Sequence, residues 1–187
     1  MELSLYKFEY EYNEDKLLNE AKGSGYVPFT DVGNQSNKNF NEWLVKHIDM
    51  KGKVIDFYKK QGNRIEVKEA WDCPYASSIQ KYFEDLLSFD ISSRFYLQKK
   101  GFNLPLHKDR GTFCSINMVL GDDYDPIRLE SDGVPTIKYY KTALLNTQSL
   151  HGVNATKDRY LFKMSFKDNS FEEVRDKLHN SLNTNKD

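Results

Sequence analysis

Hydrophobic residues recur along the chain with two different periods, and the change between them divides it into two parts. Up to about residue 91, apolar positions are three or four residues apart, as in the run from Ile79 to Phe83 and Leu86 that follows Pro74. A similar run begins at Phe40 and continues to His47 and Ile48. Spacings of three and four predict helices, so the first half is expected to be largely helical.

The N-terminal segment has patterns of its own. Aromatic residues alternate with charged ones from Tyr6 to Tyr12, which predicts a half-buried strand. The stretch "NEDKLLNEA" predicts a short helix that ends at Gly23, and "GSGYVPFTDVGNQSNKN" has the Gly, Ser and Asn content of a loop.

After Ser92 the pattern changes to short alternating segments separated by turns. The expected strands are "SRFYLQKKG", "LPLHKD", "FCSINMVLG", "PIRLES", "TIKYYKTALLN", "SLHGV" and "RYLFKMSF". About seven strands in ~75 residues is the density of a β-sandwich or a closed barrel. The sequence therefore predicts a mainly β core.

A last helix is expected after the strands. Ser170 is followed three residues later by Glu173, which is the spacing of a capping box, and Phe171, Val174 and Leu178 share one helical face. The final residues, "NSLNTNKD", are expected to fray.

The length of 187 residues suits one domain with one core. We expect residues 1–187 to form a single domain. Residues 1–91 would be an N-terminal support region of helices and strand, 92–167 the β core, and 168–187 the C-terminal helix and tail.

Charge and hydropathy exclude some classes of partner. Basic and acidic residues number 27 and 28, so the net charge of −1 gives no long-range attraction to nucleic acid or to an anionic membrane. No apolar run has the length of a membrane span, and the N-terminus lacks the apolar core of a signal peptide. Cys73 and Cys114 are too few for a disulfide framework and are expected to be small core residues. These features predict a cytoplasmic protein.

Two His-x-Asp triplets are candidates for a metal site, and their contexts distinguish them. Residues i and i+2 point to the same face of a strand, but about 200° apart around a helix. His47 and Asp49 lie in a predicted helix and are not expected to close on one ion. His107 and Asp109 lie in extended sequence, so both side chains can reach one point. His179, in the last helix, is expected to be solvated.

A third ligand is needed, because a single His-x-Asp also arises by chance. A mononuclear non-haem Fe(II) site uses two His and one carboxylate and leaves positions open for a cosubstrate and dioxygen. His151, in "SLHGV", lies in a late strand that a barrel can bring beside the first. Arg159 begins the last strand and offers the planar fork that pairs with a carboxylate.

The spacing of Gly101, His107 and Asp109, followed by His151 and Arg159, resembles the signature of the 2-oxoglutarate- and Fe(II)-dependent dioxygenases. Within that superfamily, residues 92 to 167 are most similar to the prolyl-hydroxylase-like and the aspartyl/asparaginyl β-hydroxylase-like branches. The resemblance implies a double-stranded β-helix, a jelly-roll, cupin-like barrel, here with flanking N-terminal helices and a C-terminal helix.

The resemblance also implies roles for individual residues. His107, Asp109 and His151 become the Fe(II) ligands, and Arg159 becomes the partner of the distal carboxylate of 2-oxoglutarate, with dioxygen as the second cosubstrate. Prolyl hydroxylases commonly have a Tyr nine residues before the first ligand, where this chain has Gln98. The further candidates for contact with 2-oxoglutarate are Gln98, Tyr96, Asn117 and Ser165.

The implied reaction is hydroxylation of an amino-acid side chain, in a peptide, a protein or a free amino acid, with release of succinate and CO2. On the charge argument above, the expected partner is a small molecule, a peptide or a protein, and neither a membrane nor nucleic acid is expected. The acidic loop "GDDYDPIRLESDG" is expected to be a solvated turn rather than a site for a cationic substrate. Two other classes stay open. One is a cupin-type metalloenzyme that does not use 2-oxoglutarate, and the other is a non-catalytic jelly-roll binding module.

Overall fold

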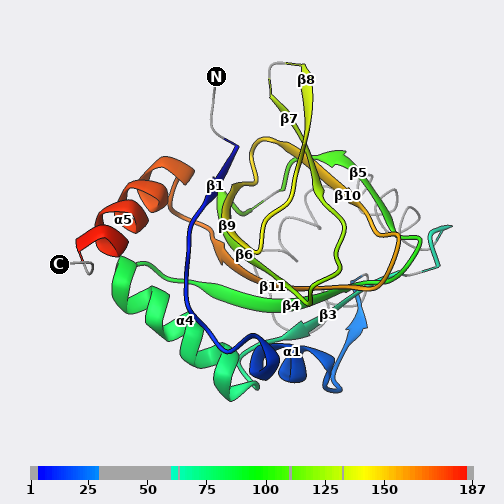
Figure 1. Cartoon of the computed structure of the whole chain (residues 1–187), viewed down its shortest axis with the longest axis horizontal. Coiled ribbons are helices and arrows are strands. Elements are labelled where there is room, and N and C mark those ends of the chain that lie inside the picture. Colours follow the sequence, from blue (N-terminus) through cyan, green and yellow to red (C-terminus); the bar gives the residue numbers. More distant parts are fainter. Residues whose placement is uncertain (1–3, 30–59, 63, 110, 132, 185–187) are drawn as a thin grey trace.

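Two antiparallel β-sheets pack face to face, and helices cover the outer face of the larger one (Figure 1). This computed structural model describes residues 4–29, 60–62, 64–109, 111–131 and 133–184. The predicted helix from Phe40 and the triplet His47 to Asp49 lie outside the described residues. The mainly β core that the sequence predicts is confirmed.

The larger sheet has seven strands and the smaller sheet has four. In spatial order the larger sheet consists of β1 (Leu5–Lys7), β9 (Thr142–Asn146), β6 (Cys114–Leu120), β11 (Arg159–Phe166), β4 (Ser92–Gln98), β3 (Ile65–Glu69) and β2 (Val27–Pro28). The smaller sheet consists of β5 (Asn103–His107), β10 (Leu150–Asn154), β7 (Ile127–Ser131) and β8 (Val134–Lys138). The β7–β8 hairpin projects from the body of the molecule (Figure 1).

The strand β11 shows how the sequence divides the interior into two compartments. Phe162, Met164 and Phe166 belong to the core between the larger sheet and the helices. Leu161 belongs instead to the cluster between the two sheets, together with Leu129 of β7. Because side chains alternate along a strand, Arg159 and Lys163 share the inner face with Leu161. Two cationic side chains therefore lie on the face that looks toward the smaller sheet.

Three described helices complete the fold: α1 (Glu14–Lys22), α4 (Pro74–Leu87) and α5 (Phe171–Thr184). The predictions for all three are confirmed in position. The capping box at the start of α5 forms, since the Ser170 backbone N–H donates to Glu173 Oε2 at 2.8 Å and the Glu173 N–H donates to Ser170 Oγ at 3.3 Å. The expectation that the chain frays from Asn180 is wrong, because α5 continues to Thr184.

Several strand predictions need correction. The strand expected from Tyr6 to Tyr12 ends at Lys7. The aromatic side chains beyond it pack on α4 instead, where the ring centroids of Tyr10 and Phe83 are 4.9 Å apart. The single strand expected over residues 136–146 is two strands, β8 and β9, which belong to different sheets. The short strands β2 and β3 were not predicted.

Both cysteines are buried free thiols, as the sequence predicts. Burial raises the pKa of the Cys114 thiol to about 12. Within the described part of the chain, no helix combines the length and the apolar character needed to cross a bilayer. The domain limits and the cytoplasmic location stay predictions.

Candidate metal centre

Three potential metal ligands converge at one end of the smaller sheet. His107 is the last residue of β5, Asp109 lies two residues after it, and His151 lies in β10. The antiparallel pairing of β5 with β10 places His107 directly opposite His151. One ligand atom from each of the three residues lies within 4.8 Å of the other two. The structure thus brings together the three residues that the sequence selected as ligands.

Backbone carbonyls fix which ring nitrogen of each histidine faces the site. His107 Nδ1 is 3.0 Å from the Pro105 carbonyl oxygen, and His151 Nδ1 is 3.0 Å from that of Ser149. A carbonyl oxygen can only accept, so both Nδ1 atoms carry their proton and donate it. In the neutral rings, both Nε2 atoms are left with a free lone pair. This is the arrangement in which histidine binds a metal through Nε2.

Both Nε2 atoms face the same carboxylate oxygen. Asp109 Oδ1 is 3.2 Å from His107 Nε2 and 3.5 Å from His151 Nε2. Two neutral imidazole nitrogens and a carboxylate oxygen are all electron-pair donors, so the three atoms favour a cation among them, either a proton on a histidine or a metal ion. The donor set of two imidazoles and one carboxylate suits a divalent transition metal such as Fe(II). His107, Asp109 and His151 would hold it.

The second oxygen of Asp109 has a different partner. Lys163 Nζ, from the inner face of β11, is 2.6 Å from Asp109 Oδ2. Burial alone raises the pKa of the Asp109 carboxyl, but the charge of Lys163 and the hydrogen bonds from the two histidines outweigh it, and the pKa lies well below its usual value. Lys163 and the two histidines therefore favour the ionised form of Asp109.

The Asp109 carboxylate affects the pKa values of both His107 and Lys163. Burial lowers the pKa of His107, but the hydrogen bonds with Asp109 and with the Pro105 carbonyl raise it above 6.5. Burial also lowers the pKa of Lys163, and the charge of Asp109 raises it above its usual value. Lys163 therefore stays charged beside the site.

Close packing of the backbone sets the position of His107. A Cβ atom added at Gly152, next to His151, would lie 2.6 Å from the Leu104 carbonyl oxygen and 2.9 Å from the Pro105 carbonyl oxygen. Real Cβ atoms essentially never approach so closely. Only glycine allows β10 to lie this near the segment of β5 that orients His107.

Asp109 is held through its backbone as well. Its N–H donates to the Thr147 carbonyl at 2.9 Å, and its own carbonyl accepts from Gln148 Nε2 at 3.0 Å. Gln148 Nε2 also donates to the Thr112 carbonyl at 2.7 Å. These bonds tie the segment after β5 to the turn before β10, which fixes the third donor relative to the two histidines.

Arg159 lies in the same interior, in a buried polar network. Its Nη1 donates to Gln98 Oε1 at 2.6 Å, and its Nη2 is 3.4 Å from the Tyr140 hydroxyl. The side chain is 3% exposed, and its Nε has no hydrogen-bond partner. No carboxylate of the described residues forms an ion pair with Arg159. A buried guanidinium without an anion is costly, so this arrangement suits an anionic ligand.

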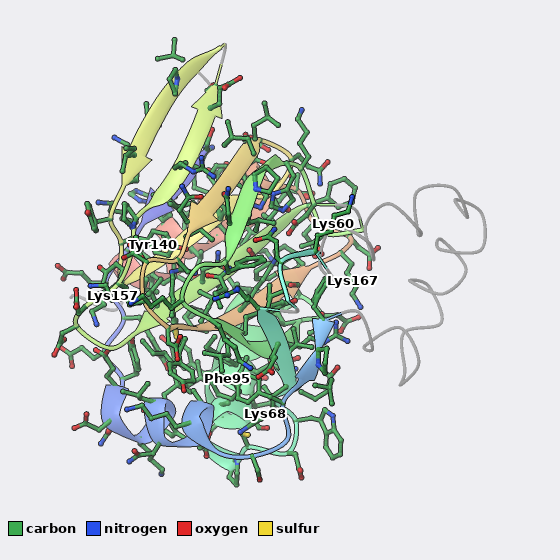
Figure 2. The ribbon with its side chains drawn as sticks, turned by 90° about the vertical axis from the view of Figure 1, so that its right-hand side faces the viewer. Lys60, Lys68, Phe95, Tyr140, Lys157 and Lys167 are labelled. Atoms are coloured by element: carbon green, nitrogen blue, oxygen red, sulfur yellow. The ribbon has the colours of Figure 1, made fainter. Side chains whose placement is uncertain are left out.

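The network continues beyond Arg159. Tyr140 accepts from Asn117 Nδ2 at 3.4 Å, and Asn117 Oδ1 accepts from Ser115 Oγ at 3.0 Å. The Tyr140 hydroxyl thus links Asn117 to Arg159. Figure 2 shows Tyr140 at the level of the strands, above α1.

The remaining two candidates for 2-oxoglutarate contact lie on the same faces. Tyr96 pairs in register with Leu161 of β11 and packs against the cluster between the two sheets. Ser165 is opposite Ser115 of β6. The contacts of all five predicted residues with a cosubstrate stay predictions.

Sequence reasoning missed Lys163, Gly152 and Tyr140. The alternation of β11 places Lys163 on the face of Arg159, which was a usable signal for a polar residue in the interior. Gly152 and Tyr140 gave no such signal, because their roles depend on the approach of strands that are distant in sequence. His179 is exposed, as expected, and its Nδ1 is 3.2 Å from the Tyr6 hydroxyl.

Comparisons with known proteins find weak structural similarities. No protein-family model matches the chain, and no curated protein matches its sequence. Among solved structures, the chain is similar to an oxidoreductase of the 2OG-Fe(II) oxygenase family from Burkholderia pseudomallei, with 14% identity and a TM-score of 0.43 over 56% of this chain and 68% of that one. A prolyl-4-hydroxylase from Pseudomonas putida gives 19% identity and a TM-score of 0.43 over 55% and 68%.

A salicylate 1,2-dioxygenase from Pseudaminobacter salicylatoxidans gives 13% identity and a TM-score of 0.32, over 41% of this chain and 21% of that one. Because these identities and TM-scores are low, the function has to be argued from the residues of this chain.

Proposed function

We propose that the chain is an Fe(II)- and 2-oxoglutarate-dependent dioxygenase that hydroxylates an amino-acid side chain, in a peptide, a protein or a free amino acid. The overall reaction consumes dioxygen and 2-oxoglutarate and yields the hydroxylated product, succinate and CO2. The observation on which the proposal rests is the convergence of His107 Nε2, His151 Nε2 and Asp109 Oδ1, with both Nδ1 protons held by backbone carbonyls.

The order of the strands supports a double-stranded β-helix. The eight consecutive strands from β4 to β11 divide equally between the sheets, with β4, β6, β9 and β11 in the larger and β5, β7, β8 and β10 in the smaller. Successive strands cross from one sheet to the other except at the β7–β8 hairpin. This winding supports a jelly roll, with the three donors at one end of the smaller sheet.

The buried Arg159 supports a dicarboxylate cosubstrate over a simple cupin-type metal site. A metal bound by three protein donors leaves positions for a chelating ligand. Arg159 lacks an anionic partner among the described residues and can take the distal carboxylate of 2-oxoglutarate in a bidentate pair. Gln98 and Tyr140, which contact the guanidinium, would hold it in place.

Each residue of the site then has a task. The metal, when bound, supplies the activation of dioxygen that side chains cannot provide. His107, His151 and Asp109 hold the ion, and Arg159 orients the cosubstrate before the reaction. The apolar cluster between the sheets, which includes Leu129 and Leu161, keeps water from the interior.

The acidic loop after β6 does not support a cationic substrate. Asp122 and Asp123 form ion pairs with Lys141 and Lys157. Asp125 accepts hydrogen bonds from the backbone N–H and the hydroxyl of Thr156 at 2.7 and 2.8 Å. These carboxylates therefore have partners within the chain.

The test is an anaerobic titration with Fe(II) and then 2-oxoglutarate, followed by visible absorption. Chelation of Fe(II) by 2-oxoglutarate gives a metal-to-ligand charge-transfer band, which we expect in the wild type and not in His107→Ala. If Fe(II) binds and no band forms, a cupin-type metalloenzyme is the better account. If the wild type does not bind Fe(II), the proposal fails and a binding module replaces it.

A further inference from the structure

Lys163 is an unusual residue for the inner face of a barrel. It lies in the middle of β11, between Leu161 and Ser165 on that face, and its side chain is only 15% exposed. Placing a lysine there requires compensation for the lost solvation of the ammonium group. The ion pair with Asp109, itself 19% exposed, supplies that compensation.

The two oxygens of Asp109 are divided between two partners. Oδ1 faces the Nε2 atoms of His107 and His151, at 3.2 and 3.5 Å. Oδ2 accepts from Lys163 Nζ at 2.6 Å. The two contacts do not compete, because each uses a different oxygen. A cation held at Oδ1 by the histidines leaves the bond from Lys163 intact.

The division limits how the carboxylate can bind a metal. A free carboxylate can coordinate through one oxygen or through both. Coordination through both would require Oδ2 to turn away from Lys163 and would break a charge-assisted hydrogen bond in a buried setting.

We propose that Lys163 is a positioning residue that restricts Asp109 to one-oxygen coordination, so that the carboxylate occupies one position on the metal and not two. This inference rests on the proposed function. Its consequence is a position kept open for a small ligand. Two histidines, one carboxylate oxygen and a bidentate cosubstrate leave one of six positions free, whereas a chelating Asp109 fills it.

The experiment uses Mn(II), whose coordinated water is measured by the relaxation of water protons at saturating metal. We expect Lys163→Met to retain Mn(II) with fewer coordinated waters than the wild type, because Asp109 is then free to chelate. Lys163→Gln retains a hydrogen-bond donor without the charge, so we expect it to restore at least part of the lost relaxation.

A matched control comes from Lys68, a buried lysine elsewhere among the described residues. Lys68 lies beside Phe95, on the helix side of the larger sheet, and its Nζ donates to the Glu20 carbonyl (Figure 2). Lys68→Met removes a buried ammonium far from the metal centre. We expect it to reduce stability and to leave the water relaxation of bound Mn(II) unchanged.

The outcomes separate this inference from the proposed function. Equal relaxation in the wild type and in both Lys163 variants overturns the inference while the metal site stands. A folded Lys163→Met that binds no Mn(II) also overturns it, because Lys163 would then be needed for binding itself. A wild type that binds neither Mn(II) nor Fe(II) overturns the proposed function, and the role of Lys163 with it.

Discussion

Replacing Gly152 with alanine tests whether the contact between β10 and β5 positions the metal ligands. The added Cβ lies 2.6 Å from the Leu104 carbonyl oxygen, and ordinary contacts begin at 3.4 Å. The two strands must therefore separate by about 0.8 Å, the difference between these distances. The Pro105 carbonyl, which accepts from His107 Nδ1, moves with its strand.

The expected effects follow from that displacement. Overpacking of this kind costs about 1–3 kcal/mol of the free energy of unfolding. Disturbing the hydrogen bond that orients a ligand histidine lowers metal affinity by roughly 10–100-fold. Thermal unfolding of the metal-free protein measures the first quantity, and a competition titration with Mn(II) and a fluorescent chelator measures the second.

Gly133→Ala is the matched control. Gly133 has φ +74° in the turn of the β7–β8 hairpin, and an added Cβ there meets no atom within 4 Å. The left-handed backbone makes alanine costly by about 1 kcal/mol, without any effect on β5. If Gly152→Ala loses stability but binds Mn(II) like Gly133→Ala, the close approach of the strands does not position His107, and the reasoning is refuted.

Three further predictions concern the interior charges and the last helix. Arg159→Met should weaken 2-oxoglutarate binding to the metal-loaded protein by about 1.5–3 kcal/mol and leave metal affinity unchanged in calorimetry. Arg175→Met, at a half-buried position on α5, should change neither affinity, and equal weakening by both variants would contradict the role of Arg159. Burial lowers the pKa of His107, but the hydrogen bonds with Asp109 and with the Pro105 carbonyl together outweigh this effect and raise the pKa above 6.5. As the pH falls through that raised pKa, the metal-free protein should gain free energy of unfolding in melting curves, and Mn(II) affinity should drop in binding curves. A Mn(II) affinity that does not change with pH would exclude His107 as a ligand. Ser170→Ala removes the capping box and should lower the free energy of unfolding, measured with urea, by about 1 kcal/mol. An unchanged free energy of unfolding would show that α5 does not need the capping box.

The parts of the fold that the sequence predicts well are those in which local pattern and tertiary packing agree. The strand β11 has the bounds that the sequence predicts, because one face meets the helices and the other meets the smaller sheet. The start of α5 follows from the capping box, which is formed by residues three positions apart.

The strand predictions that were wrong concern segments whose packing partners are distant in sequence. The aromatic alternation from Tyr6 to Tyr12 is satisfied by packing on α4, with no neighbouring strand beyond Lys7. The run over residues 136–146 has no Gly or Pro in its middle to mark the point where the chain crosses from one sheet to the other.

The residues of the candidate site also differ in how far the local sequence predicts their positions. The His-x-Asp spacing and the strand context single out His107 and Asp109 as candidates, because both residues lie in one short segment, although a third ligand was needed to favour a metal site. The position of His151 opposite His107 depends on the register of β5 with β10, which no local pattern specifies. The ion pair of Lys163 with Asp109 likewise depends on the packing of β11 against the end of the smaller sheet.

The charges in the interior predict the order in which ligands bind. Among the described site residues, Lys163 balances Asp109, and Arg159 adds one positive charge. A divalent metal raises this local charge further, and a dianionic cosubstrate then lowers it, so the dianion should bind more tightly after the metal than before it. We expect 2-oxoglutarate affinity to rise by roughly 5–150-fold in the presence of Mn(II), the range typical of coupling between two ligands. Because coupling is reciprocal, 2-oxoglutarate should raise Mn(II) affinity by the same factor in calorimetry. Equal 2-oxoglutarate affinity with and without Mn(II) would show that the cosubstrate does not bind at the metal.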